Sequence, residues 1–289
     1  NKTGTTITEN DWEKIRDCLK AYTVDYSNSD FKDTNTDGTT YSVDYQNMLK
    51  SVYTNGGFWI GRYEAGLEEG KNPRTLYTEI SASDKAVVKQ NKIPYNYVKR
   101  DEAQTLAQKM DYGDCKGSLI FGIQWDLALK YIEEKTVETV EEANKDKVRT
   151  DIKRKLTSKS TTIGNYRNSA FILNRGKFAQ YNALSKWYNF NSEEKPTLVT
   201  GSQKQAQSSN SNAILLTTGA TEATNLQNIY DIAGNVWEWT IEYAQSVDIP
   251  CTFRAGSASD AGEYPPVAYR ENRSTDNSYF NIGFRVSIF

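Results

Sequence analysis

The chain has 289 residues, a net charge of −2, 37% hydrophobic and 12% aromatic residues, with 19 Tyr and 6 Trp. Such a length can bury a substantial core, as one large domain or two small ones. The near-neutral charge gives no electrostatic argument for nucleic-acid binding. No apolar run approaches the roughly 20 residues of a membrane helix, so we expect no membrane span. The chain begins at Asn1 without a visible signal peptide, so we expect it to be processed or trimmed.

Cysteine and histidine usage excludes several chemistries. The three cysteines, Cys18, Cys115 and Cys251, are too few and too scattered for a disulfide framework or a zinc site. At most one bridge can form. Histidine is absent, which excludes Ser–His–Asp and Cys–His catalysis and histidine-ligated metals.

The first predicted element is an amphipathic helix from Asp11 to Tyr22, whose apolar residues recur at helical spacing. Thr8 or Asn10 would cap its N-terminus. A polar stretch follows this helix.

That polar stretch contains the spacing D-x-N-x-D-G with an acid at position 12. Its candidate calcium ligands are Asp33, Asn35, Asp37 and Asp44. The pattern resembles the loop of dockerin-type modules, which a helix follows. Position 12 is Asp rather than a bidentate Glu, and no clear helix enters the loop. An ordinary Asp/Asn/Gly-rich turn is therefore the alternative.

Periodicity predicts the next elements. We expect helices at 45–52, 101–110 and 124–133, and a strand at 56–65 after a Gly-Gly turn. The run from Glu133 to Lys159 alternates acidic and basic residues and predicts a solvated helical insertion. The low-complexity stretch from Gln203 to Asn212 predicts a mobile surface loop.

The most distinctive stretch is Asn228 to Thr240, N-I-Y-D-I-A-G-N-V-W-E-W-T. Because strand side chains alternate, Trp237 and Trp239 share one face and Glu238 points to the other. Gly234 lets the backbone turn tightly just before this strand.

This stretch closely resembles the core motif of the formylglycine-generating-enzyme (sulfatase-modifying factor) family, a variant of the C-type-lectin fold. Asn281–Val286 (N-I-G-F-R-V) resembles the family's closing strand, and Gly56–Ala65 its opening strand. Gln124–Ala128 stands where the family's second helix begins. The resemblance covers roughly 56–289 and implies an α+β, C-type-lectin-like domain, with an insertion at about 133–160 and an N-terminal helical extension at 1–55.

The family's catalytic groups are missing from this sequence. Its enzymes oxidise a substrate cysteine with two copper-binding cysteines, which align here on about Ala261 and Pro266 when Tyr269-Arg270 is matched. Cu(I) needs thiolate or thioether ligands, so neither position can bind it. Cys251 lies upstream and alone. The related sulfoxide synthases use histidine-ligated iron. We therefore expect no copper, no iron and no enzymatic activity; the alternative, a copper-dependent formylglycine-generating oxidase, is disfavoured.

The resemblance also implies a structural calcium ion in this chain. Its ligands would be the Asp231 and Glu238 carboxylates and the Gly234 and Val236 carbonyls, oxygen donors of the type that Ca²⁺ prefers. The alternative is an aromatic strand that exposes one solvated acid.

Between Ser257 and Asn281 the chain has few aliphatic residues and many Tyr, Ser, Asn, Asp and Arg, a composition that resembles antibody paratopes. It also resembles the C-terminal segment of diversity-generating-retroelement variable proteins, found in phage tails and on bacterial surfaces, which varies just before a G-F-R-type word. The candidate ligand-binding residues are Ser257, Ser259, Asp260, Glu263, Tyr264, Tyr269, Arg270, Arg273, Ser278, Tyr279, Phe280 and Asn281. The alternative is an ordinary polar surface loop.

These features together predict a ligand- or receptor-binding protein that displays a candidate hypervariable surface, as in phage-tail or bacterial adhesion proteins. The expected partner is a protein or glycan receptor on a cell surface, and subunits of a phage or surface assembly are further candidates. The expected location is extracellular, on a cell surface or on a virion. A structural subunit of such an assembly is a second alternative.

Overall fold

The computed structural model describes residues 8, 10–33, 42–110 and 112–289. Its helices are α1 (Trp12–Tyr22), α2 (Ser42–Asn55), α3 (Arg100–Lys109), α4 (Gly122–Glu138) and α5 (Lys145–Thr157), with 3-10 turns η1 (Glu142–Asn144), η2 (Ser160–Thr162), η3 (Asn210–Asn212) and η4 (Glu222–Thr224).

The central sheet is built around one long strand. Its members are β1 (Phe31–Lys32), β14 (Trp237–Ala244), β15 (Cys251–Arg254), β16 (Arg270–Arg273) and β17 (Ile282–Phe284). The order is β1-β14-β15-β16, and β17 pairs with β14 in parallel while the other pairs are antiparallel. β14 is therefore bonded to strands from both ends of the chain.

A second sheet closes the core and has the order β2 (Trp59–Ile60), β18 (Val286–Ile288), β5 (Gly117–Leu119). The remaining strands form small sheets: β3 (Gly66–Leu67) with β4 (Ala86–Val87); β6 (Phe171–Ile172), β10 (Gln203–Lys204) and β9 (Val199–Thr200); β11 (Ile214–Leu216), β7 (Lys177–Gln180) and β8 (Tyr188–Asn189); and β12 (Asn225–Leu226) with β13 (Ile229–Tyr230).

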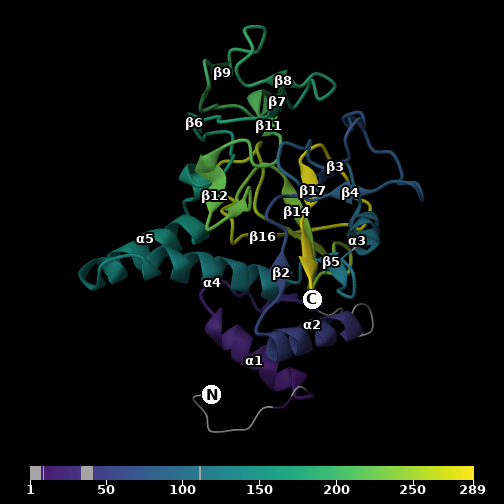
Figure 1. Cartoon of the computed structure of the whole chain (residues 1–289), viewed down its shortest axis with the longest axis vertical. Helices are drawn as coiled ribbons and strands as arrows, with labels where there is room; N and C mark the ends of the chain where they lie inside the picture. Colours follow the sequence, from purple (N-terminus) through teal and green to yellow (C-terminus); the bar gives the residue numbers. More distant parts are fainter. Residues whose placement is uncertain (1–7, 9, 34–41, 111) are drawn as a thin grey trace.

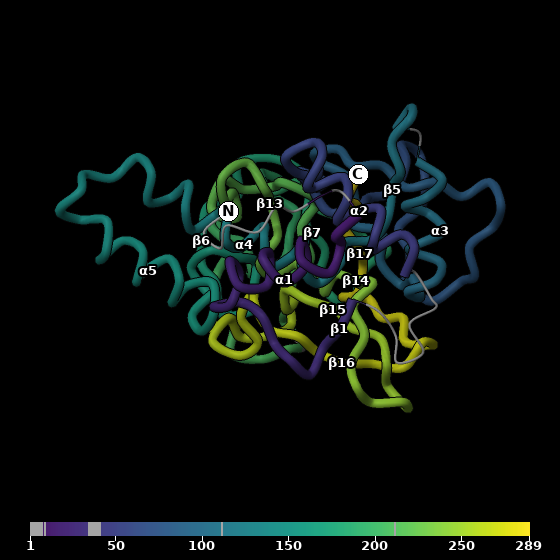
Figure 2. The backbone as a smooth tube through the Cα atoms, turned by 90° about the horizontal axis from the view of Figure 1, so that it is seen from below, coloured from purple at the N-terminus to yellow at the C-terminus, as the bar shows by residue number. Residues whose placement is uncertain are grey.

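Figure 1 shows β14 and β17 in the middle of the molecule, with α1 and α2 below them and the small sheets of β6 to β11 at the opposite end. The helices α4 and α5 project together from the body to one side, as both views show (Figures 1 and 2). Helices are interspersed with short strands in the first part of the chain, and the sheets are mostly antiparallel, so the structure is mixed α and β and consistent with the predicted α+β class.

The main core forms because β14 alternates. Trp237 and Trp239 both face Phe253, with ring centroids 4.5 and 5.2 Å apart, and Glu238 lies on the opposite face. The predicted alternation is therefore confirmed. Ile15 of α1 and Met48 of α2 belong to the same buried cluster, so these two helices pack as an extension of this core.

Two local expectations differ from the structure. Asp11, the residue immediately before α1, makes no side-chain hydrogen bond that caps the helix. The predicted cap Thr8 instead donates to the Asp11 carboxylate with both its backbone N–H and its hydroxyl. The stretch predicted as a long strand keeps strand geometry only at Trp59–Ile60. The Gly61 N–H still donates to the Val286 carbonyl, and the backbone bends at Arg62 and Tyr63.

Two surface predictions also need correction. The insertion does form helix α5, but Ile152 and Leu156 are buried against the body, so one of its faces is core. The expected mobile loop contains β10, whose Lys204 is buried and donates to the Tyr166 and Ser169 carbonyls. Composition alone did not reveal this, because a buried lysine is rare. Among the described residues, no helix has both the length and the apolarity needed to cross a membrane.

Candidate functional site

The turn before β14 is held by buried polar groups. Gly234 has φ +75°, and a Cβ there would lie 2.4 Å from the Asn165 carbonyl oxygen, so only glycine fits. The side-chain amide nitrogen of Asn235 donates to Glu64 at 2.7 Å, and the side-chain oxygen of Asn235 accepts from the Leu216 backbone N–H at 2.9 Å. Glu64 was not predicted as part of this turn, because it is far away in sequence.

The carboxylates predicted to bind calcium have protein partners. Asp231 accepts from the Gly219 backbone N–H at 2.6 Å and from the Thr224 hydroxyl at 2.7 Å. Glu238 accepts from Arg285 Nη2 at 2.7 Å and Nε at 3.0 Å, and both side chains are fully buried. Burial raises the pKa of both carboxyls.

The fit of this turn to calcium can be judged from its donors. Ca²⁺ needs six to eight oxygen ligands with a net negative charge around it. At Glu238 the Arg285 guanidinium already provides the positive charge, and an ion would have to displace it. Among the described residues, no group of three or more Asp, Glu, Cys or His side chains is arranged to hold a metal ion. The residues as they lie do not fit calcium, and calcium at Asp231, Gly234, Val236 and Glu238 stays a prediction.

The second predicted calcium loop is described only at its two ends. Asp33 is buried and accepts from the backbone N–H groups of Gly122 and Ile123, the first turn of α4. Asp44 is paired with Lys116. Asn35 and Asp37 lie outside the described residues. Asp33 thus acts as a cap on α4, where the helix dipole favours a negative charge.

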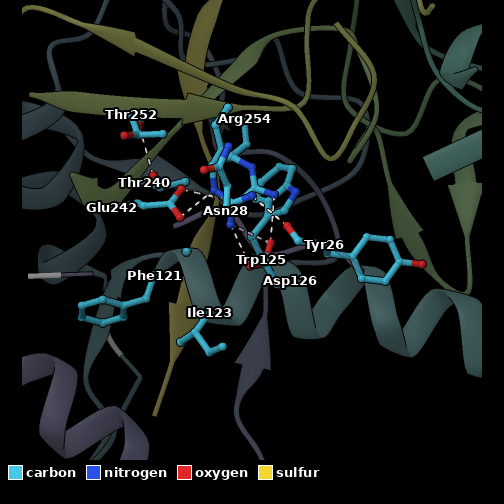
Figure 3. A network of polar contacts seen from close by, with 12 residues as sticks. Tyr26, Asn28, Phe121, Ile123, Trp125, Asp126, Thr240, Glu242, Thr252 and Arg254 are labelled. Carbon is cyan, nitrogen blue, oxygen red and sulfur yellow. Dashed lines mark hydrogen bonds and ion pairs between the residues drawn. The ribbon is translucent and has the colours of Figure 1, made fainter. Parts of the chain in front are cut away.

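A buried network of charges lies behind the C-terminal loops. Asp126 of α4 accepts from Arg254 Nη2 at 3.0 Å, and from Arg270 Nη2 at 2.9 and 2.7 Å. Glu242 of β14 accepts from Arg270 Nε at 2.8 Å. Figure 3 shows Asp126, Glu242 and Arg254 pointing toward one another from the helix and the two strands. The Tyr26 carbonyl also accepts from Arg270, which fastens the N-terminal extension to the same network.

This network holds both ends of one long loop. Arg254 is the last residue of β15 and Arg270 the first of β16, so residues 255–269 connect two strands that share one carboxylate. Another buried arginine, Arg285, directly follows β17, the strand at the end of the next connection, and pairs with Glu238 of β14. Ion pairs thus lie at the bases of the two connections.

The two connections enclose a pocket of about 320 Å³. Its floor is formed by Trp237, Phe253 and Ile282 of the sheet. The candidate ligand-binding residues that line it are Asp260, Tyr264, Tyr269, Arg273, Tyr279 and Asn281. Tyr264 is 69% exposed and Tyr279 50% exposed, so both rings are open to a ligand.

The pocket walls are fixed by local contacts. The Tyr264 and Tyr269 hydroxyls are 2.7 Å apart, and their rings meet edge to face with centroids at 4.9 Å. The Asn281 amide donates to the hydroxyls of Ser257 and Ser259 at 2.9 and 3.0 Å. Burial raises the pKa of Asp260, which accepts from Ser257. Ser257 and Ser259 therefore brace the pocket from behind.

The other candidates lie elsewhere. Arg270 is buried in the charge network, where it cannot meet a ligand of the pocket. Phe280 packs on the cluster of Leu215 and Val236, and its ring centroid is 5.0 Å from that of Tyr181. Ser278 and Glu263 do not line the pocket; the Glu263 carboxylate accepts from the Asn168 amide at 2.8 Å, which lowers its pKa.

The opposite directions of Tyr279 and Phe280 were not predicted from the sequence; Phe280 lies in a turn, in which the Ile282 backbone N–H donates to the Tyr279 carbonyl. Neighbouring residues in an extended segment point to opposite sides, a rule that would have separated Tyr269 from Arg270. Glu271 also lines the pocket and was not among the candidates.

The positions of the family's two cysteines lie on this loop as Ala261 and Pro266. Cys251 is fully buried in β15, and burial raises the pKa of its thiol, which disfavours the reactive thiolate. Cys18 and Cys115 are exposed free thiols.

Comparison with known proteins gives one result of note. No family model matches the chain, and no curated protein matches it. Among solved structures, Treponema denticola variable protein 1 is similar with 14% sequence identity and a TM-score of 0.37, covering 80% of this chain and 84% of that chain. Similarity at this level defines neither a family nor a fold.

Proposed function

We propose that the chain is a non-enzymatic binding protein, which presents the pocket between its C-terminal loops to a protein or glycan receptor. We also propose that the scaffold is C-type-lectin-like, as the motifs at 228–240 and 281–286 suggest. The observation that supports binding best is an open aromatic pocket whose loops are anchored from beneath by buried arginines.

The chemistry of the pocket suits recognition of a polar surface. Tyr264, Tyr269 and Tyr279 offer large contact area at low entropic cost, since a Tyr side chain has few rotamers to lose. Glu271 and Arg273, which pair with each other, supply charged hydrogen-bond groups in the pocket lining. Aromatic rings combined with a few polar groups are common in interface centres.

The anchoring of the loops supports a role in which their residues can change. The exposed Tyr264 side chain contributes little to the core, because Arg254 and Arg270 hold the ends of its loop, whereas Tyr269 packs partly on the main core. This is consistent with a candidate hypervariable surface on a phage tail or a bacterial surface protein, and with an extracellular, cell-surface or virion location. The proposed binding role does not require an assembly partner. The alternative, a structural subunit of a phage or surface assembly, would have the same fold.

Binding of the fluorescently labelled chain to a glycan array and to intact bacterial cells tests the proposal. The double variant Tyr264→Ala with Tyr279→Ala should lose at least about tenfold in affinity, as expected for central aromatic contacts. Tyr53→Ala is the control, since Tyr53 is 46% exposed on α2, away from the pocket. Binding that the double variant retains in full would contradict the proposal. Copper-dependent oxidation of a C-x-P-x-R peptide that requires Cys251 would favour the oxidase instead.

A further inference from the structure

A larger pocket of about 820 Å³ lies away from the C-terminal loops, where the N-terminal extension meets the domain. The N-terminal extension lines one side of this pocket with Leu19 and Tyr22 of α1 and Val52 of α2. Leu127 of α4 and the segment around β2 line other sides. The two parts of the chain that form it share the main core, so the pocket is a permanent feature of the fold.

The lining is mainly apolar and partly open to solvent. Phe58, Ile60 and Leu127 are half-buried within it. Trp59 is 76% exposed and Tyr131 is 46% exposed at its edge. Apolar side chains that gather around a concave surface of this size, unlike scattered single ones, indicate a binding site.

The charged side chains at the rim of this pocket differ in whether they have an oppositely charged partner. Lys135 is paired with Glu138 at 2.5 Å, and Glu134 with Arg149 at 2.6 Å. Arg62 has no acidic partner in the part of the chain that the structure describes. Its guanidinium donates to a neutral group, the amide oxygen of Asn228 at 3.2 Å, a residue that also lines the pocket.

The Arg62 guanidinium is held in place from behind. It lies 5.5 Å from the centroid of the Tyr230 ring and 5.7 Å from that of Tyr63. Stacking on two rings fixes the plane of the group and leaves N–H donors available for a bidentate contact. A guanidinium without a carboxylate partner, fixed beside an apolar pocket, is complementary to a carboxylate on an apolar body.

We propose that this pocket binds a small amphipathic carboxylate, with its aliphatic or aromatic body against Phe58, Trp59 and Leu127 and its carboxylate on Arg62. The volume lies within the range of small-molecule sites, roughly 300–1,000 Å³. This site is independent of the pocket between the C-terminal loops.

Isothermal titration calorimetry of the full chain with decanoate tests this, below the concentration at which decanoate forms micelles. Decyltrimethylammonium, which has the same chain and the opposite charge, is the matched control ligand. We expect saturable binding of decanoate, weakened by about tenfold in Arg62→Gln, because one charge-assisted contact is lost. Trp59→Ala should weaken decanoate by a similar factor through lost apolar contact. Arg154→Gln and Leu76→Ala, which change an exposed arginine and an exposed apolar side chain elsewhere, should bind decanoate as the native chain does.

Three results would overturn the proposal. The first is no saturable decanoate binding by the native chain. The second is equal decanoate affinity in Arg62→Gln and the native chain, or a preference for decyltrimethylammonium. The third is a native dimer in sedimentation velocity that Trp59→Ala converts to a monomer, which would make the surface an interface between two copies.

Discussion

Replacing Asp126 by Ala should be among the most damaging single changes in the chain. Its carboxylate joins α4 to β15 and β16, and its removal would leave the guanidinium groups of Arg254 and Arg270 with only Glu242 between them. The change would therefore strand a positive charge in the interior without opening a large cavity.

The magnitude follows from burial. The Asp126, Arg254 and Arg270 side chains are at most 5% exposed, so water cannot replace the lost carboxylate. Removing one partner of a buried pair costs about 3–5 kcal/mol, because the remaining charge stays desolvated and unpaired. That is a large part of the roughly 5–15 kcal/mol by which most domains are stable. We expect Asp126→Ala to lower the free energy of unfolding by about 3–5 kcal/mol.

Urea denaturation followed by tryptophan fluorescence measures this change. Asp25→Ala is the control, because Asp25 pairs with Lys153 at 2.8 Å on the surface, with side chains 41% and 34% exposed. Exposed pairs contribute under about 1 kcal/mol. If Asp126→Ala were no more destabilising than Asp25→Ala, the network would not anchor the loops, and the reasoning would be refuted.

Three further predictions concern other buried groups. Burial lowers the pKa of Lys204 to about 7, below the roughly 10.4 of an unfolded chain, so its contribution to the free energy of unfolding rises from pH 7 to pH 9. The melting temperature should rise over the same pH range, and Lys204→Met should flatten this rise. An unchanged slope in the variant would contradict the burial of Lys204. Because Glu238 is already paired with Arg285, a calcium chelator should leave the melting temperature unchanged, whereas a drop that Glu238→Ala abolishes would establish the predicted calcium site. Phe280→Ala should cost about 2 kcal/mol of unfolding free energy and Tyr279→Ala under about 1 kcal/mol, by urea denaturation; equal costs would show that both rings face the same way.

The elements that sequence predicts well are those with a regular period. The alternation of Trp237, Glu238 and Trp239 is enough to predict which side chains share a face, because the strand period is two; it does not predict that Glu238 is buried as well. Helices α1, α3 and α4 were likewise predicted from their apolar spacing, within a few residues at each end. Helix caps were not, since Asp33 caps α4 from far away in sequence.

The partners of buried charges could not be predicted from sequence alone. The strand period places Arg270 and Arg273 on opposite faces, but nothing local shows that Arg270 is the one buried against Asp126 and that Arg273 lines the pocket. Both lie in a polar segment, and their roles differ because β16 places one against α4 and the other at the surface. The buried Lys204 was hidden in a low-complexity stretch for the same reason.

We propose that the C-terminal loops form a surface that is separable from the scaffold that holds them. A saturation library scored for folding by display on yeast cells and protease resistance tests it most directly. We predict that Tyr264, Glu271 and Tyr279 accept most amino acids with protease resistance unchanged, while Asp126 and Arg254 accept almost none. If substitutions at the three pocket positions unfold the chain as often as those at Asp126 and Arg254, the loops are part of the core and the claim is contradicted.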